Sequence, residues 1–228
     1  MIFTSKRIGL DPIDINIDGH SIDKVMSTKF LGVYIDNKLN WKRHIDHVCG
    51  KVSRGLGIIL KARQLLTRNS LKTLYYSFIY PYFTYCNHVW GSTYPTTLNP
   101  LFLRQKRAIR IIAGAKFLDH TDPLFCSLNL LKLHDINTFV ISKFMYKWYH
   151  CKLPVVFRNT FTLVSDTHNH NTRNSYHLRP ISIKTNLGKS RYQYRAPNIW
   201  NSIMKSKVNP DVSEAVFVKS IKHCIKVG

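Results

Sequence analysis

The chain has 228 residues, of which 44% are hydrophobic and 12% aromatic. This length and composition exclude a disordered protein and allow one or two domains with a buried core. The 34 lysines and arginines outnumber the 12 acidic residues, so the formal net charge is +22, and all of the excess lies in residues 41–228. Such an excess is typical of a protein that binds polyanions, although a solvated basic surface alone would also produce it.

The five cysteines form no C-x-x-C pair. An odd number of scattered cysteines favours a reducing compartment over a disulfide framework. The N-terminal segment lacks the apolar run of a signal peptide, and the chain has no N-x-[ST] sequon. Residues 73–103 carry no charged side chain, but prolines and polar residues interrupt the apolar stretches. We therefore expect an intracellular protein with no membrane partner, and the sequence does not decide between nucleus and cytoplasm.

The first 35 residues predict β structure. Isoleucines alternate with polar residues over 13–17, as one buried strand face requires. Asp18 and Gly19 follow with the positive φ preference of a two-residue hairpin turn. A further strand is predicted over Phe30–Ile35, where Gly32 marks either a bulge or a point at which another backbone approaches.

Helical periodicity begins after Asn40, which is a good N-cap for a helix that starts at Trp41. The apolar stripe of this helix comprises Trp41, Ile45, Val48, Cys49, Val52, Leu56, Ile59 and Leu60. A second helix is predicted from about Ser70. Pro81 should kink or end it, and a further helical piece should run to Trp90.

Two more helices follow in the middle of the chain. Pro100 suits the first turn of a third helix over Leu101–Ala113, and Gly114 suits its C-cap. A fourth helix is predicted over Leu133–His150, where apolar residues again recur at helical spacing.

The last third of the chain has less regular patterns. Residues 155–190 lose the periodicity and predict loops, and the alternation over 191–195 predicts a strand. Residues 197–204 predict a short helix, and Asp211 with Glu214 forms a capping box for a last helix. The predicted fold class is therefore α+β and mostly helical, with a short N-terminal antiparallel β hairpin, a helical bundle and a basic C-terminal α/β region.

Four blocks of the chain, taken in order, resemble one protein family. The blocks are KFLGVYIDNKLNWKRHI at Lys29–Ile45, LKTLYYSFIYPYFTYCNHVWG at Leu71–Gly91, LRQKRAIRII at Leu103–Ile112, and HNTRNSYHLRP with GKSRYQYRAPNIWNSI between His170 and Ile203. The family is the jockey-like type of non-LTR retrotransposon reverse transcriptases. The resemblance covers nearly all of the chain.

The resemblance implies three parts. Residues 1–40 would be a remnant of the palm, with a segment similar to the primer grip that steadies the 3′ end of the primer. Residues 41–154 would form a helical thumb-like domain that holds the template–primer duplex, and residues 155–228 a basic C-terminal region. The primer-grip-like residues are Phe30, Leu31 and Gly32.

The family's catalytic signature, [FY]-x-D-D, is absent, and no two acidic residues are adjacent. Polymerases need carboxylates that converge on two metal ions roughly 3.5–4 Å apart. The closest acidic pairs, Asp11 with Asp14 and Asp119 with Asp122, fall in loop-like stretches. Although the family's polymerases use Mg²⁺, we expect no catalytic residue, no cofactor and no polymerase activity from this chain alone.

Other chemistry has weaker signals. His44, His47 and Cys49 lie close in sequence, but zinc would need a second pair of ligands at a proper interval. A P-loop, a G-x-G-x-x-G motif and a Ser/His/Asp pattern are absent. The sequence therefore predicts no metal site and no hydrolase.

Basic residues recur along the predicted first and third helices, mostly away from the apolar stripes, and two arginines flank Tyr192 and Tyr194. These basic residues are the candidates for nucleic-acid binding: Lys42, Arg43, Lys51, Arg54, Arg104, Lys106, Arg107, Arg110, Arg191 and Arg195. Duplex binding without sequence preference depends on such side chains facing phosphates. The tyrosines would either stack on bases or fill the core.

These observations predict sequence-independent binding of RNA, DNA or an RNA–DNA duplex. Two alternatives stay open at this stage. The chain would be a non-enzymatic protein-interaction or architectural module that docks through the aromatic segment 74–90, or a degenerate fragment without function. No particular protein partner follows from the sequence.

Overall fold

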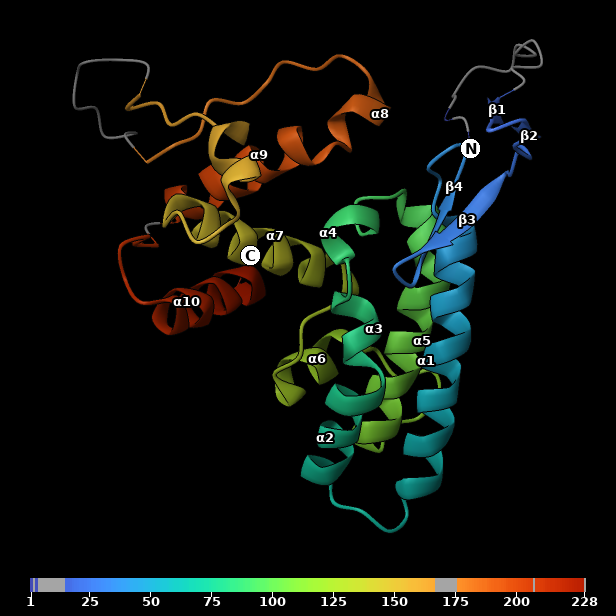
Figure 1. The fold of residues 1–228 in the computed structure, drawn as a ribbon. Coiled ribbons are helices and arrows are strands. Elements are labelled where there is room, and N and C mark those ends of the chain that lie inside the picture. The colour runs from blue at the N-terminus through green and yellow to red at the C-terminus, as the bar shows by residue number, and fades with distance from the viewer. Residues whose placement is uncertain (2, 4–14, 167–175, 207, 228) are drawn as a thin grey trace.

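The structure is a computed structural model that describes residues 1, 3, 15–166, 176–206 and 208–227. The fold is α+β and mostly helical, as predicted. Figure 1 shows two small hairpins at one end of a pair of long helices, α1 and α5, with the C-terminal helices packed to one side. No helix in the described parts of the chain is long and apolar enough to cross a membrane.

The first hairpin joins β1 (Asn16–Ile17) to β2 (His20–Ser21). Asp18 and Gly19 both have positive φ, at 49° and 79°, which confirms the predicted two-residue turn. The predicted buried face is wrong for the residues described, because Ile17 is 57% exposed. Position 13 lies outside them. Within the described residues no third strand pairs with this hairpin, so its isoleucines have no neighbouring strand there to pack against.

The second hairpin joins β3 (Ser27–Phe30) to β4 (Val33–Asp36). The single strand predicted over Phe30–Ile35 is therefore wrong. Leu31 and Gly32 adopt φ of 45° and 81° and form another two-residue turn, so Gly32 is a turn residue and not a bulge.

Helix α1 (Lys42–Ala62) begins one residue later than predicted, because Trp41 adopts the left-handed conformation with φ 63°. The N-cap residue is therefore Trp41 and not Asn40 as predicted, although the Asn40 Oδ1 accepts a hydrogen bond from the Lys42 N–H at 2.9 Å. The Asp36 carboxylate accepts bonds from three backbone N–H groups of residues 38–41 and ties the hairpin to the helix. The predicted stripe is buried or partly buried, except for the exposed Leu60.

Three short helices return along α1: α2 (Arg68–Phe78), α3 (Tyr80–Thr84) and α4 (Asn87–Trp90). Pro81 lies in the first turn of α3 and separates it from α2, as predicted. Cys86 has a φ of 48° and marks the break before α4. The backbone crossing between α1 and α2 is close, because a Cβ on Gly55 would lie 2.8 Å from the Phe78 carbonyl oxygen.

Helix α5 (Pro95–Ala113) starts six residues earlier than predicted. Pro95 supplies the first-turn proline, whereas Pro100 lies inside the helix and removes one backbone hydrogen bond. Gly114 caps its C-terminus with φ 70°, as predicted. The helix α6 (Asp122–Leu128) was not predicted, because seven residues are too few to display a helical period.

The C-terminal third contains α7 (Leu133–Tyr149), the 3₁₀ helix η1 (Val155–Thr160), α8 (Asn186–Lys189), α9 (Tyr192–Lys205) and α10 (Glu214–Val227). The strand predicted over 191–195 is wrong, because this segment opens α9. The Asp211 carboxylate accepts a hydrogen bond from the Tyr149 hydroxyl at 3.1 Å.

Two clusters of buried side chains form the core. The first cluster is formed by the helices α1 through α6 and the start of α7. The second is formed by the rest of α7 with α9 and α10. Helix α7 belongs to both, with Ile136 in the first and Ile141 in the second. The three-part division at residues 40 and 154 stays a prediction.

Candidate nucleic-acid interface

One group of basic side chains gathers around Tyr34 on β4. The hairpin register pairs Lys29 with Tyr34, and the Lys29 ammonium lies 5.7 Å from the centre of the tyrosine ring. The Arg43 guanidinium lies 5.2 Å from the same centre, and its side chain also donates to Ser27 Oγ. Such cation–π contacts hold positive charge at the junction of the hairpin and α1.

Further cations adjoin this group along α1. The His47 ring lies 5.0 Å from the Tyr34 ring. The pKa of His47 is lowered, first by burial and then by the positive charges of Lys51, Lys29 and Arg54. The His47 imidazole is therefore neutral at pH 7, and the positive charges near it are those of Lys29, Lys51 and Arg54.

A shallow groove of about 250 Å³ separates α1 from α5, which run in the same direction. Its lining comprises Ser53, Leu56, Gly57, Leu60, Arg104, Arg107 and Ile111. Arg104 is fixed, because its Nε donates to Ser53 Oγ at 3.0 Å and its Nη1 to the Pro100 carbonyl at 2.9 Å. Arg107 is exposed. Arg54 follows Ser53 in α1, and consecutive residues point about 100° apart around a helix, so Arg54 lies on the face of α1 next to the groove and not in its lining.

We call these side chains together the α1–α5 cationic face. Its members are Lys29, Arg43, Lys51, Arg54, Arg104 and Arg107. Sequence reasoning missed Lys29. A two-residue turn at Leu31 and Gly32, had it been recognised, would have placed Lys29 opposite Tyr34 and therefore beside Arg43.

The other predicted basic residues lie elsewhere. The Lys106 ammonium lies 4.7 Å from the centre of the Phe102 ring, which stacks against α6. Arg110 donates from Nε to the Asp119 carbonyl at 2.9 Å and so holds the turn after α5. Lys42 is exposed at the start of α1. The structure therefore does not bring all four basic residues of α5 onto one face.

Arg191 and Arg195 form a separate group at the start of α9. Arg191 is exposed and Arg195 is partly buried. Between them, the Tyr192 ring packs edge-to-face on Phe144 with centres 5.1 Å apart. Tyr192 therefore packs against a neighbouring ring, and a role of these tyrosines in stacking on bases stays a prediction.

The basic residues of the α1–α5 cationic face have no acidic partners within the part of the chain that the structure describes. In the described part of the chain, the one salt bridge joins Lys132 Nζ to Asp122 Oδ1 at 2.8 Å. It lies between α6 and α7, away from the face. Positive charges that stay unpaired on a surface attract counterions, and a phosphate backbone releases those counterions when it binds.

The primer-grip-like residues occupy the tip of the second hairpin. Phe30 and Leu31 are 62% and 73% exposed. The Tyr85 hydroxyl donates to the Leu31 carbonyl at 2.7 Å and fixes the tip against α3. Gly32 lines a cavity of about 680 Å³ between the hairpin, α1 and α3, together with Tyr85. A role in holding a primer stays a prediction.

His44 lies beneath the second hairpin and is 3% exposed. Its Nδ1 accepts a hydrogen bond from the Tyr34 N–H at 3.4 Å, and its Nε2 has no partner among the described residues. Burial, with a smaller effect of His47, lowers the pKa of His44 to about 4. The imidazole is therefore neutral and carries its hydrogen on Nε2, and it links α1 to the hairpin and packs against Trp90.

The aromatic segment 74–90 is divided between core and surface. Tyr75, Phe83 and Trp90 are fully buried, whereas Tyr82 is 37% and Tyr85 54% exposed. Docking of a protein partner through this segment stays a prediction.

The polymerase metal site has no counterpart among the described residues. No three His, Cys, Asp or Glu side chains gather there in a way that would hold a metal ion. Asp122 is paired with Lys132, and Asp119 accepts a hydrogen bond from the Lys116 N–H at 2.7 Å. Each of these two carboxylates thus already has a partner within the chain. Asp11 and Asp14 lie outside the described residues.

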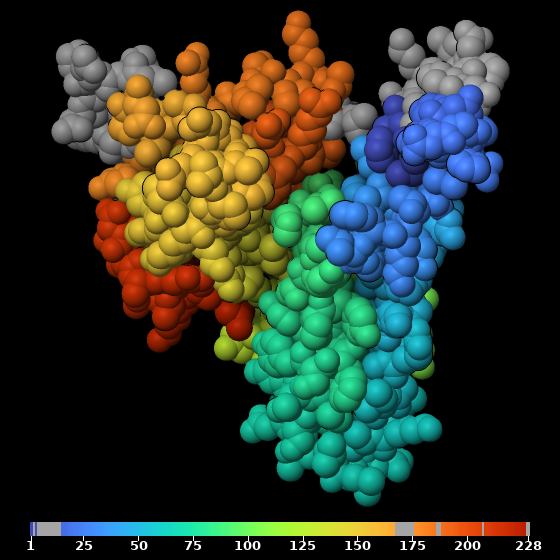
Figure 2. Space-filling model, viewed as in Figure 1, coloured from blue at the N-terminus to red at the C-terminus, as the bar shows by residue number. Residues whose placement is uncertain are grey.

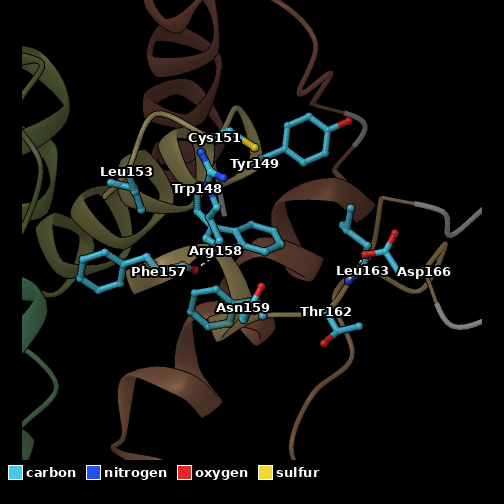
Figure 3. A pocket seen from close by; sticks show the side chains of 11 residues that line it. Trp148, Tyr149, Cys151, Leu153, Phe157, Arg158, Asn159, Thr162, Leu163 and Asp166 are labelled. Carbon is cyan, nitrogen blue, oxygen red and sulfur yellow. Dashed lines mark hydrogen bonds between the residues drawn. The ribbon is translucent and has the colours of Figure 1, made fainter. Parts of the chain in front are cut away.

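A cavity of about 520 Å³ lies between the end of α7 and η1. Trp148 closes one side, and its Nε1 donates to the Phe157 carbonyl at 2.9 Å. Figure 3 shows the Arg158 guanidinium and the Asp166 carboxylate on opposite sides of this cavity. Arg158 and Asp166 therefore form no ion pair across the cavity.

Comparison with curated proteins gives three relatives. Two are RNA-directed DNA polymerases from the mobile element jockey. The protein of Drosophila funebris is 27% identical over 124 residues, or 53% of this chain, and that of Drosophila melanogaster is 27% identical over 145 residues, or 62%. A probable RNA-directed DNA polymerase from transposon BS of Drosophila melanogaster is 24% identical over 131 residues, or 56% of the chain.

The matches cover only 14–16% of the relatives' own lengths. No protein-family model matches the chain. No solved structure matches it either. The relatives nevertheless agree with the resemblance drawn from the four sequence blocks. The chain is therefore related to a stretch of the jockey-like non-LTR reverse transcriptases.

Proposed function

We propose that the α1–α5 cationic face binds the phosphate backbone of an RNA, DNA or RNA–DNA duplex without sequence preference. The observation that carries this proposal is that two neighbouring groups of basic side chains, one around Tyr34 and His47 and one in the α1–α5 groove, have no carboxylate partner among the described residues. The relationship to RNA-directed DNA polymerases supports it, because such enzymes act on nucleic acid strands.

Local geometry of the face also supports the proposal. Arg104 is held by two hydrogen bonds, so little side-chain entropy is lost when it contacts a phosphate. A Cβ added at Gly50 or Gly57 would meet no atom within 4 Å, so the outer side of α1 is open beside Arg54. A phosphate backbone can approach such a helix surface closely.

The test compares two triple variants that remove the same charge. The first, Arg54→Gln with Arg104→Gln and Arg107→Gln, removes three members of the face. The control, with glutamine in place of Lys116, Lys205 and Lys219, removes three exposed lysines from other surfaces. Circular dichroism establishes that both variants fold, and fluorescence anisotropy measures duplex affinity over a range of salt concentrations.

We expect the first triple variant to lose affinity by about tenfold or more and to reduce the slope of log K against log salt by roughly 3 units. The control should keep the slope of the unmodified chain. Equal losses in the two variants would show diffuse attraction by net charge, and the face would be rejected as the binding site.

We further propose that this chain does not extend a primer by itself. The support is the lack of adjacent acidic residues in the sequence and the lack, among the described residues, of a group of three His, Cys, Asp or Glu side chains that would hold a metal ion. A primer-extension assay with Mg²⁺ and all four deoxynucleotides should give no product. Incorporation by the purified chain would contradict this part of the proposal.

A further inference from the structure

Two adjoining cavities lie where the start of α1, the helix α4 and the start of α9 meet, away from the α1–α5 groove. The larger cavity has a volume of about 550 Å³ and the smaller about 250 Å³. They share four lining residues, Leu39, Trp41, Ser92 and Ser190. In Figure 2 the orange C-terminal segments and the blue N-terminal hairpins diverge above the green α4, and the lining comes from these three parts of the chain and from the yellow segment that holds Phe144 and Phe157. A joint volume of this size is typical of small-ligand sites.

Half of the residues that line the larger cavity carry a ring. Phe144 makes edge-to-face contacts with Tyr192 at 5.1 Å and with Phe157 at 5.4 Å, and it stacks with His88 at 6.2 Å between ring centres. Trp41 lines the same cavity from the start of α1. Burial lowers the pKa of His88, so its ring is neutral at pH 7. This lining suits a flat, uncharged, aromatic group.

The smaller cavity supplies positive charge. Lys189 and Arg195 line it, and Arg191 lines the larger cavity. The Arg195 side chain is partly buried and has no hydrogen bond or ion pair among the described residues, and burial lowers its pKa. Among the described residues, no Asp or Glu lines either cavity. A partly buried guanidinium with no counter-charge favours an anion from outside the chain.

The Tyr192 ring lines the larger cavity, but its hydroxyl is buried away from the surface and makes no hydrogen bond within the described residues. The ring, and not the hydroxyl, therefore faces a ligand in the cavity.

We propose that the joined cavities hold one unstacked nucleotide of a nucleic acid strand, with the base among Trp41, Phe144 and Tyr192 and the phosphate at Lys189 and Arg195. The aromatic and cationic parts lie side by side, as base and phosphate do in a nucleotide. This site is distinct from the α1–α5 cationic face and does not depend on it.

Isothermal titration calorimetry with adenosine 5′-monophosphate tests the site in the full chain. Adenosine 5′-monophosphate should bind at least tenfold more tightly than ribose 5-phosphate, which lacks the base, and single-stranded hexaadenylate should bind more tightly than the monophosphate. Equal binding of adenosine 5′-monophosphate and ribose 5-phosphate would show a phosphate site only and overturn the proposal. Binding of the monophosphate with exclusion of the hexanucleotide would overturn the assignment to a strand.

Two variants locate the binding. Val89 lines the larger cavity and is 45% exposed, so Val89→Trp should fill the cavity without disturbing the core and should weaken adenosine 5′-monophosphate binding at least fivefold. Arg195→Gln should weaken adenosine 5′-monophosphate in the same way but leave adenosine unchanged. Unaltered affinity for the monophosphate in both variants would overturn the proposal.

The two proposed sites fail separately. The triple variant of Arg54, Arg104 and Arg107 should keep its affinity for adenosine 5′-monophosphate, because none of these residues lines the cavities. Val89→Trp should keep the salt slope of duplex binding. A loss of adenosine 5′-monophosphate binding in the triple variant would show that the two sites are one, and it would overturn the inference.

Discussion

The buried amide of Gln105 gives the sharpest test of how the helical bundle is held together. Gln105 is 0% exposed. Its Nε2 donates to the Tyr75 hydroxyl and to the Leu131 carbonyl, each at 2.9 Å, and its Oε1 accepts from the Leu133 N–H at 2.8 Å. One side chain therefore connects α5, α2 and the entry to α7. The variant Gln105→Leu keeps the size of the side chain and leaves three buried polar groups without a partner.

The expected cost follows from these three groups. An unsatisfied buried group costs about 1–3 kcal/mol, so three cost roughly 3–6 kcal/mol after allowance for relaxation. The apolar leucine recovers about 1–2 kcal/mol. We expect Gln105→Leu to lower the free energy of unfolding by about 3 kcal/mol. Tyr75→Phe removes one hydroxyl and leaves the other two bonds, so it should cost about 1 kcal/mol.

Urea unfolding followed by circular dichroism measures both variants and the double variant. Once Gln105 is replaced, Tyr75→Phe should cost nothing or stabilise the protein, because the orphaned hydroxyl is then removed. A cost below 1 kcal/mol for Gln105→Leu, or strict additivity of the two changes, would refute the view that this amide joins the three segments.

Two further predictions concern α1. Gly55→Ala should destabilise the chain by about 1–3 kcal/mol in urea unfolding, since its Cβ would meet the Phe78 carbonyl, whereas Gly50→Ala should stabilise it by roughly 0.5–1 kcal/mol because its Cβ has open space; equal effects would contradict the close crossing. The pKa of His44 is about 4 when folded, below its ordinary 6.5, so the unfolded chain takes up the proton first and stability falls as the pH drops from 6.5 towards 4. Between pH 7 and pH 5 this loss is about 2 kcal/mol, and His44→Asn, which keeps an acceptor for the Tyr34 N–H, should remove it; an unchanged pH profile would refute the burial effect.

Apolar periodicity was enough to find the helices that form the main core. Val52 and Ile59 of α1 are fully buried, and Ile109 of α5 is too. In such long helices each apolar residue repeats the same 3.6-residue signal, so errors at single positions average out. The first residues of α1 and α5 were predicted incorrectly, because a helix start depends on the local backbone conformation, as at Trp41 and Pro100, and not on the apolar repeat.

The errors lie where the pattern is short or where a turn decides it. Tyr192 and Tyr194 alternate over only five residues, whereas Tyr192, Ala196, Ile199 and Ile203 continue at helical spacing through α9. The short alternation gave the wrong strand. A non-glycine residue such as Leu31 rarely adopts positive φ, so its turn carried little signal in the sequence.

The candidate face was only partly predictable. Lys106 and Arg107 are neighbours in the chain, yet Lys106 packs on Phe102 towards α6 and Arg107 lines the groove with α1. A helical wheel separates a polar side from an apolar side, but which neighbour covers each polar residue depends on the packing of helices distant in sequence. For the same reason the sequence did not predict that Arg195 lines a cavity, because that cavity depends on the packing of α9 beside α4.

The charge distribution also links stability to binding. With 34 basic residues and 12 acidic residues, the chain carries a self-repulsion that opposes the compact state. Added salt screens this repulsion, so the free energy of unfolding should rise between about 0.05 and 0.5 M sodium chloride, whereas duplex affinity should fall over the same range. A ligand that binds only the folded chain stabilises it, so a duplex should raise the melting temperature most at low salt. If the melting temperature falls with added salt in the absence of nucleic acid, the basic side chains do not repel one another in the folded chain. That result would contradict the claim that the cations of the α1–α5 cationic face have no acidic partners.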